Sequence, residues 1–261
     1  MSSFENKIVV ITGCASGIGL ATTLLFLSRK ALVFGVDISP FTASLPPAHS
    51  PNFTFHQANL GAPSAVDDAI AACKARHGPR IDVLANVAGV MDHFCSVDTV
   101  KDAEWERVLT INLTVPVRMM AAVLPGMREQ KSGAIVNVGS YSSLSGAVAG
   151  VAYTASKHGL AGATKNVAWR FRNEGIRCNA VLPGGVPTNI VSSMTKEDWD
   201  QEAFDMFSPV QALSQSAKRD NLPHGSAGPE DIAEGIAFLA SDNAKAINGI
   251  MMPIDNAWSA I

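Results

Sequence analysis

The chain has 261 residues, of which 47% are hydrophobic and 16% charged, and its formal net charge is −3. A weakly acidic sequence with no basic cluster interleaved with aromatic residues disfavours DNA and RNA as partners. No signal-peptide pattern precedes the first apolar segment, and no apolar run is long enough to cross a bilayer. We therefore expect a cytoplasmic protein without a membrane span.

The cysteines and histidines are scattered without the spacing of a metal site, so we expect no bound metal. The four cysteines should be reduced thiols, as is usual in the cytosol. Cys14 lies inside a glycine-rich segment, where we expect thiol reagents to reach it.

The first element begins with an apolar run at residues 8–11, which leads into the glycine-rich residues 12–19 and a helical pattern at residues 20–27. This order predicts a strand, a tight turn and a helix. Glycines at such a junction let the backbone approach a pyrophosphate and place that anion at the positive N-terminus of the helix. The pattern favours a nucleotide-binding loop over a glycine-rich turn that binds nothing.

A second apolar run, at residues 31–36, ends at Asp37, about eighteen positions after Gly19. A carboxylate at this offset accepts hydrogen bonds from the adenosine ribose and repels a 2′-phosphate. Cys14 and Ala15 offer no cation for such a phosphate. We therefore expect NAD rather than NADP as the cofactor; the alternative is a carboxylate that only begins the next loop.

Short apolar runs alternate with helical patterns along the rest of the chain, and such alternation builds a parallel sheet covered on both faces. We predict an α/β fold, a single Rossmann-like, doubly wound domain over residues 1–261, with the cofactor at the carboxyl ends of the strands. The seven expected strands lie near residues 7–12, 31–36, 52–57, 81–85, 133–138, 176–182 and 249–254.

Tyr153 and Lys157 are four positions apart, which places a phenol and an ammonium on one face of a predicted helix. A nearby cation lowers the pKa of a phenol and makes proton exchange with an alcohol or carbonyl practical. The alternative is an ordinary solvated helix face.

Several motifs together resemble the short-chain dehydrogenase/reductase family, over a span from about residue 5 to the C-terminus. They are the glycine loop at residues 12–19, Asn-Val-Ala-Gly at 86–89, Asn112, Ser140, Tyr153, Lys157 and the segment 183–188. Ser140 precedes Tyr153 by the thirteen residues that are usual in the family.

This resemblance implies a catalytic tetrad. Tyr153 would exchange the substrate proton while Ser140 orients the same oxygen. Lys157 would lower the pKa of Tyr153 and hydrogen-bond the nicotinamide ribose, and Asn112 would support a water that leads the proton to solvent. The cofactor-binding residues it implies are Gly13, Ser16, Gly17, Ile18, Gly19, Asp37, Asn59, Leu60, Asn86, Ala88, Gly89, Tyr153, Lys157, Pro183, Gly184, Val186 and Thr188.

The chain departs from the family pattern at three positions. Asn59 stands where relatives often carry aspartate, Val87 where they carry asparagine, and Gly139 where many carry serine. An asparagine carbonyl can still accept a hydrogen bond from adenine.

Residues 189–228 correspond to the substrate lid of the family. The large apolar side chains expected to enclose a hydrophobic substrate, or else to pack against the body, are Met194, Trp199, Phe204, Met206, Phe207 and Leu213, with Met91, His93, Phe94 and Leu144 as the opposite wall. Several segments are similar to fungal relatives that act on terpenoid or polyketide intermediates.

We therefore expect an NAD-dependent oxidoreductase that interconverts a secondary alcohol and a ketone on a hydrophobic, terpenoid, steroid-like or polyketide small molecule. Two alternatives stay open: a non-redox cyclase or isomerase, and a nucleotide-binding protein without turnover. The family usually forms homotetramers or homodimers through helices near residues 104–129 and 152–174 and the C-terminal strand.

Overall fold

The computed structural model describes residues 4–190, 194–216 and 227–260. They form one parallel sheet with the strand order β3-β2-β1-β4-β5-β6-β7. The strands are β1 (Ile8–Thr12), β2 (Leu32–Asp37), β3 (Phe53–Gln57), β4 (Val83–Asn86), β5 (Gly133–Val138), β6 (Ile176–Pro183) and β7 (Met251–Ile254). The predicted seven-stranded, doubly wound architecture is confirmed.

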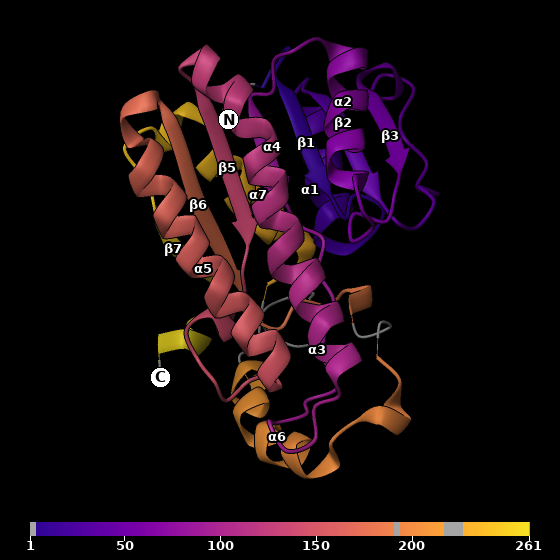
Figure 1. Cartoon of the computed structure of the whole chain (residues 1–261), viewed down its shortest axis with the longest axis vertical. Helices are drawn as coiled ribbons and strands as arrows, with labels where there is room; N and C mark the ends of the chain where they lie inside the picture. The colour runs from indigo at the N-terminus through magenta and orange to yellow at the C-terminus, as the bar shows by residue number, and fades with distance from the viewer. Residues whose placement is uncertain (1–3, 191–193, 217–226, 261) are drawn as a thin grey trace.

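Helices cover both faces of this sheet. They are α1 (Gly17–Ser28), α2 (Ala65–His77), α3 (Asp102–Leu109), α4 (Val115–Gln130), α5 (Val151–Phe171), α6 (Gln201–Ser216) and α7 (Pro229–Ala240). In Figure 1, α2, α4 and α5 lie in front of the sheet and α1 and α7 behind it, while α3 and α6 lie beyond the carboxyl ends of the strands. The strand order reverses between β2 and β4, the two neighbours of β1, and the first glycine loop lies at this switch point.

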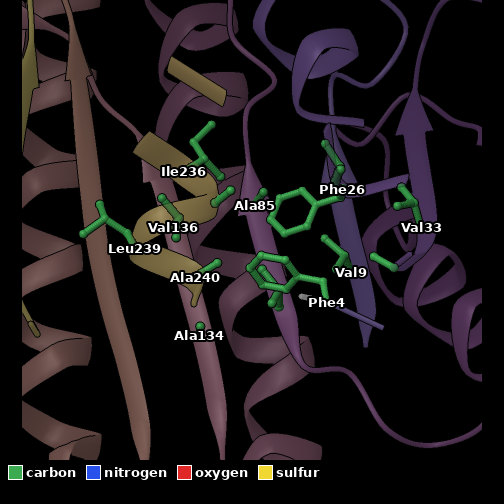
Figure 2. Packing of buried hydrophobic residues seen from close by; sticks show 14 of the residues in the cluster. Phe4, Val9, Phe26, Val33, Ala85, Ala134, Val136, Ile236, Leu239 and Ala240 are labelled. Carbon is green, nitrogen blue, oxygen red and sulfur yellow. The ribbon is translucent and has the colours of Figure 1, made fainter. Parts of the chain in front are cut away.

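Each face of the sheet has its own apolar core. β-branched residues of the central strands alternate between the two, so Val9 and Ile11 face α1 and α7 while Ile8 and Val10 face α2 and α4. On the first face the rings of Phe4 and Phe26 meet edge to face at 4.7 Å between centroids (Figure 2). These cores hold the carboxyl ends of the strands in a fixed arrangement.

The longest helical stretch runs from Asp102 to Gln130 and joins α3 to α4 through a π-helical turn, Thr110–Thr114. By length and composition alone this stretch could cross a membrane. Its α4 portion packs against the sheet, because Met119, Met120 and Val123 are fully or almost fully buried in the second core. The stretch is therefore accounted for as a core helix.

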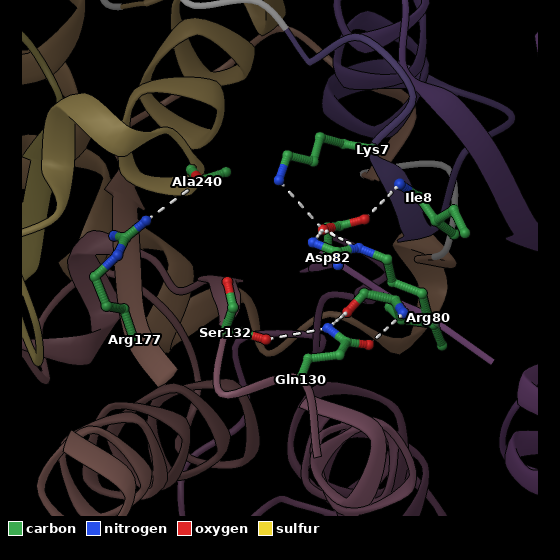
Figure 3. Close-up of polar contacts among 9 residues, drawn as sticks. Lys7, Ile8, Arg80, Asp82, Gln130, Ser132, Arg177 and Ala240 are labelled. Carbon is green, nitrogen blue, oxygen red and sulfur yellow. Dashed lines mark hydrogen bonds and ion pairs between the residues drawn. The ribbon is translucent and has the colours of Figure 1, made fainter. Parts of the chain in front are cut away.

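At the amino ends of the strands the buried carboxylate of Asp82 is fully engaged (Figure 3). It accepts hydrogen bonds from the Ile8 backbone N–H at 2.9 Å and from Arg80 Nε at 2.8 Å, and Lys7 lies 3.5 Å away. Arg177 donates to the carbonyls of Ala240, the last residue of α7, and of Ser241, its C-cap. These contacts stabilise the amino ends of the strands. The candidate catalytic and cofactor-binding residues lie at the carboxyl ends.

Candidate active site

A cavity of about 480 Å³ opens at the switch point between β1, β2 and β4. Eleven of the predicted cofactor residues line it: Gly13, Ser16, Gly17, Ile18, Gly19, Asp37, Asn59, Leu60, Ala88, Gly89 and Thr188. Most of the residues predicted to bind the cofactor are thus gathered around one cavity.

Three positions of the glycine loop, Gly13, Gly17 and Gly19, do not accommodate a side chain without strain or a clash. Gly13 and Gly17 have φ angles of 71° and 49°, in the left-handed region that favours glycine. A Cβ on Gly19 would lie 1.8 Å from the carbonyl oxygen of Gly13, and one on Gly13 would lie 2.8 Å from Ala88 Cα. The loop thus brings bare backbone to the N-terminus of α1, which is the arrangement that receives a diphosphate.

Thr12 ties this loop to the segment after β4. Its hydroxyl oxygen accepts hydrogen bonds from the backbone N–H groups of Val87 and Ala88, at 3.0 and 3.1 Å. Val87 needs no side-chain amide for these bonds, since the backbone makes them. The replacement at this position therefore leaves the cavity wall intact.

Asp37 ends β2 at the rim of the cavity. Its carboxylate accepts hydrogen bonds from the Ala15 N–H and the Ser39 N–H, both at 2.9 Å. Each carboxylate oxygen keeps a free lone pair for a ribose hydroxyl. The Asn59 side-chain oxygen, in contrast, already accepts from the Gly61 N–H at 3.0 Å, which leaves it one lone pair for adenine.

Arg107, on α3, also lines the cavity and was missed in the sequence. It is the one cation among the described lining residues, and Asp37 is the one carboxylate. Its guanidinium donates to the Met91 carbonyl at 2.9 Å, and no ion pair joins it to a described carboxylate. An arginine can donate five hydrogen bonds, so donors remain for an anionic ligand.

The candidate catalytic side chains lie beside this cavity. Tyr153 and Lys157 are buried on one face of α5, and the side chain of Ser140, which follows β5, is near enough to the Tyr153 hydroxyl to oppose the rise in its pKa. A Cβ added to Gly89, in the cavity wall, would lie 3.7 Å from Lys157 Nζ and 3.3 Å from Asn112 Oδ1. The four predicted tetrad residues are thus brought to one place.

Burial, rather than attraction between the two groups, is the main cause of the shifted pKa values of Tyr153 and Lys157. It raises the pKa of Tyr153 to about 12, against the hydrogen bond from Ser140, and lowers the pKa of Lys157 to about 8. The expectation that the pKa of Tyr153 is lowered is therefore wrong, because the net shift is upward. Lys157 Nζ donates to the Val138 carbonyl at 3.0 Å instead of to the phenol.

Asn112 lies in the π-helical turn between α3 and α4. Its side chain accepts from the Val90 N–H and donates to the Val90 carbonyl, both at 2.9 Å, and it contacts Ser156 Oγ at 3.2 Å. π-Helical turns are frequent at functional sites. Here the turn aims a buried amide at the segment that carries Gly89.

Comparison with known proteins identifies the family. A family model described as short chain dehydrogenase matches residues 7–199. The Asnovolin H dehydrogenase nvfC of Aspergillus novofumigatus is 50% identical over 262 residues and covers all of both chains. The short chain dehydrogenase prhI of Penicillium brasilianum is also 50% identical, again over the whole of both chains. The chain belongs to the short-chain dehydrogenase family. The predicted resemblance to fungal members is confirmed.

Solved structures of short-chain dehydrogenases agree in fold. Levodione reductase superposes with a TM-score of 0.83 at 30% identity, with 98% of this chain and 99% of that chain covered. A putative NAD(P)-dependent gluconate 5-dehydrogenase from Beutenbergia cavernae, solved with bound NADP, also gives 0.83, at 27% identity and 99% coverage of both chains.

Six of the seventeen predicted cofactor residues do not line the cavity of this short-chain dehydrogenase: Tyr153 and Lys157, which lie beside it, and Asn86, Pro183, Gly184 and Val186. Asn86 is buried at the end of β4, where it pairs with Asn137 of β5, and its side-chain amide donates to Asn137 Oδ1 at 2.9 Å. Val186 packs against the first core, and Pro183 and Gly184 belong to the end of β6 beside β7. Thr188, in contrast, lies over the glycine loop, within 3.1 Å of a Cβ placed on Gly17.

The lid expected at residues 189–228 lies partly outside the described residues, since 191–193 and 217–226 are not among them. In the described part, Trp199, Phe204 and Phe207 pack on the ring of Phe94 at 5.1 to 5.3 Å between centroids. Met206 and Leu213 are exposed, and so is Leu144 of the expected opposite wall. Phe94 thus contacts three aromatic side chains of the lid segment, and His93 accepts hydrogen bonds from the N–H groups of Thr195 and Asp200 in the same segment.

Gly139, the third departure from the family pattern, has a steric reason. A Cβ at this position would lie 2.5 Å from Leu182 Cδ2 and 2.9 Å from Ser143 Oγ. Ser143 Oγ accepts from the Ser140 N–H at 3.2 Å, and this bond helps to orient Ser140.

Cys14 is fully buried, so the expected access of thiol reagents is wrong. Its sulfur fills the space over Gly35, and burial together with the Asp37 charge raises its pKa to about 12. No group of three or more His, Cys, Asp or Glu side chains within the described ranges could hold a metal ion.

Proposed function

We propose that this short-chain dehydrogenase is an NAD-dependent enzyme that interconverts a secondary alcohol and a ketone on a hydrophobic substrate. The observation that carries this proposal is the buried side chain of Tyr153, near Ser140 and beside a cavity that Asp37 lines. The three groups supply proton exchange, substrate orientation and ribose recognition.

The residues present fit a dinucleotide. The glycine loop would receive the diphosphate on backbone N–H groups, and Arg107 would face it from the opposite wall. Asp37 would accept from the adenosine ribose, and Asn59 and Leu60 would adjoin adenine. When bound, the nicotinamide ring supplies a hydride acceptor or donor next to the substrate carbon.

The chain itself moves the proton. In alcohol oxidation the Tyr153 oxygen would take the proton of the substrate hydroxyl while Ser140 donates to the same substrate oxygen. The Lys157 charge favours the phenolate that this step requires, although burial opposes it. Asn112 would keep the neighbouring wall at Val90 in place and lead toward solvent through a water.

Asp37 supports NAD over NADP. A 2′-phosphate would be repelled by this carboxylate, whose two hydrogen bonds to backbone N–H groups fix it at the rim. Arg107 is the one cation among the described lining residues, and it lies on α3 rather than on the β2 strand that carries Asp37.

A bulky terpenoid, steroid-like or polyketide alcohol is the proposed substrate class. The aromatic side chains that pack on Phe94 would offer such a substrate an apolar surface. One relative is named as a dehydrogenase of Asnovolin H, and it is similar to this chain over its whole length.

The deciding experiment is a screen of secondary alcohols, from small diols to steroid and terpenoid alcohols, with NAD and NADP in parallel. Reduced cofactor should form with a bulky alcohol and NAD, and product structure should show a ketone at the carbinol carbon. Tyr153→Phe serves as the blank. Preferential use of NADP would refute the cofactor assignment, and a rearranged product without reduced cofactor would refute the redox assignment.

We further propose a homodimer or homotetramer in the cytoplasm. Trp105, Val117 and Trp169 are exposed on α3, α4 and α5, and Trp169 keeps 69% of its surface accessible. Apolar side chains of this size favour association. Light scattering of the purified protein and localisation of a fluorescent fusion test the two statements separately.

A further inference from the structure

A buried carboxylate that the proposed mechanism does not use lies at the start of the catalytic helix. Asp92, in the loop after β4, is 1% exposed. It accepts hydrogen bonds from the backbone N–H groups of Tyr153 at 2.8 Å, Gly150 at 3.1 Å and Phe94 at 3.3 Å. One side chain therefore holds the backbone of the catalytic tyrosine and that of the residue that contacts the lid.

The first N–H groups of a helix have no partner within the helix, and a negative charge near them is stabilising. Helix α5 has Gly150 at its N-cap and no side-chain cap of its own. Asp92 supplies this cap from a distant part of the chain. The approach is close, because a Cβ on Gly150 would lie 2.6 Å from Asp92 Oδ2.

The loop that carries Asp92 is strained where it meets the lid. Phe94 has a φ of 66°, which is uncommon for a bulky residue. The hydrogen bond to Asp92, the hydrogen bond from Val151 N to the Cys95 carbonyl and the packing of Phe94 against Trp199 and Phe207 hold this conformation.

We propose that Asp92 is a positioning residue: it fixes the first turn of α5, and with it the Tyr153 hydroxyl, relative to the lid-contacting Phe94. Asp92 does not line the cofactor cavity, so it acts through Tyr153 and not by touching the cofactor. This inference rests on the proposed role of Tyr153.

The charge of Asp92 also acts on Tyr153. After burial and the opposing hydrogen bond from Ser140, the Asp92 carboxylate is a further cause of the raised pKa of Tyr153. The other charged or titratable groups around this junction are His93, Cys95, Glu104, Arg107, Lys157 and Asp200. Removing the negative charge while keeping the side-chain shape should lower the pKa of Tyr153.

The test compares Asp92→Asn and Asp92→Ala with Asp98→Asn, an exposed carboxylate in the same loop region. We expect kcat for alcohol oxidation to fall about tenfold in Asp92→Asn and further in Asp92→Ala, because asparagine keeps one acceptor oxygen. NADH affinity should stay within about twofold, since the cavity lining is unchanged, and Asp98→Asn should match the parent. Parental kcat in Asp92→Ala, or a parallel loss of NADH affinity, would overturn the proposal.

A spectroscopic titration of Tyr153 tests the proposal without measuring turnover. The chain has two tyrosines, so in a Tyr141→Phe background the near-ultraviolet phenolate band reports Tyr153 alone. Adding Asp92→Asn should move this ionisation to lower pH; an unchanged midpoint would overturn the electrostatic part. If the parent binds NADH but oxidises no alcohol, the proposed function fails while this titration still tests Asp92.

Gly150→Ala gives a second variant at the same junction, for use if the Asp92 variants do not fold. Its Cβ must displace Asp92 or the start of α5, so kcat should fall while NADH affinity is kept. Parental kcat in a folded Gly150→Ala protein would count against a role for this contact in placing Tyr153.

Discussion

Lys157 Nζ lies 5.4 Å from the centroid of the Tyr153 ring and therefore faces the ring of the phenol. A cation over an aromatic face is attracted to it, and here both partners are buried. Burial favours the neutral form of each group. It therefore disfavours both the phenolate form of Tyr153 and the ammonium form of Lys157. The state active in oxidation, a phenolate beside an ammonium, is then a minor one.

The pH dependence of oxidation follows from these two values. Below a pH of about 8 Lys157 is charged and Tyr153 neutral, so the phenolate–ammonium state grows about tenfold per pH unit. Between about 8 and about 12 the pair holds one proton in total, and the fraction in that state is constant. We expect kcat/KM to rise with a slope of about one and level off near pH 8. A rate that falls between pH 6 and 8 would contradict this.

Tyr153→Phe should lower kcat by a factor of about 10² to 10⁴, because the variant loses the proton-exchanging hydroxyl. NAD affinity should be nearly intact. The matched control is Tyr141→Phe, which changes the other tyrosine, a residue that packs against Trp258. Cofactor reduction and fluorescence titration with NADH measure the two quantities. Full activity in Tyr153→Phe would refute the assignment.

The fold and the cavity were predictable because their signals are local. A strand, a glycine turn and a helix adjoin in sequence, and Asp37 directly follows its strand. Arg107 and Asp92 were not predictable from sequence. Only the tertiary fold brings Arg107 to the cavity and Asp92 to the start of α5. Asn86 shows the reverse case: its motif marks the cavity, but the register of β4 and β5 turns its amide to Asn137.

Asp37→Ala should weaken NAD binding about tenfold and relax discrimination against NADP, since both the ribose acceptor and the repulsive charge are removed. Some of the loss will come from the glycine loop, whose Ala15 N–H loses its partner. Dissociation constants for NADH and NADPH measure the effect, and Asp98→Ala is the control. An unchanged NADH to NADPH ratio would count against the ribose contact.

Arg107→Gln should weaken NADH and ADP-ribose about tenfold while leaving adenosine affinity almost unchanged, because adenosine carries no phosphate. Arg107→Lys should keep part of the affinity for NADH and ADP-ribose, because it keeps the positive charge. Binding of these ligands should depend more strongly on salt concentration in the parent than in Arg107→Gln. Competition titrations with the three ligands measure this. A loss confined to NADPH, or a change in substrate KM alone, would place the guanidinium elsewhere.

Asp82→Asn should lower the free energy of unfolding at neutral pH by about 1–3 kcal/mol, because it weakens the hydrogen bonds to Arg80 and Ile8 at a buried site. Burial alone would raise the pKa of Asp82, but the bonds from Arg80 and Ile8 and the Lys7 charge outweigh it and hold the pKa below its ordinary value. The stabilisation is therefore present above the ordinary pKa of 3.8 and is lost as the pH falls through the lower folded value. Urea unfolding measures the difference in the free energy of unfolding between parent and variant, and this difference should become smaller as the pH is lowered from neutral to acidic. Asp98→Asn should unfold with the same free energy as the parent. A difference between the parent and Asp82→Asn that grows toward low pH would contradict the role assigned to Asp82.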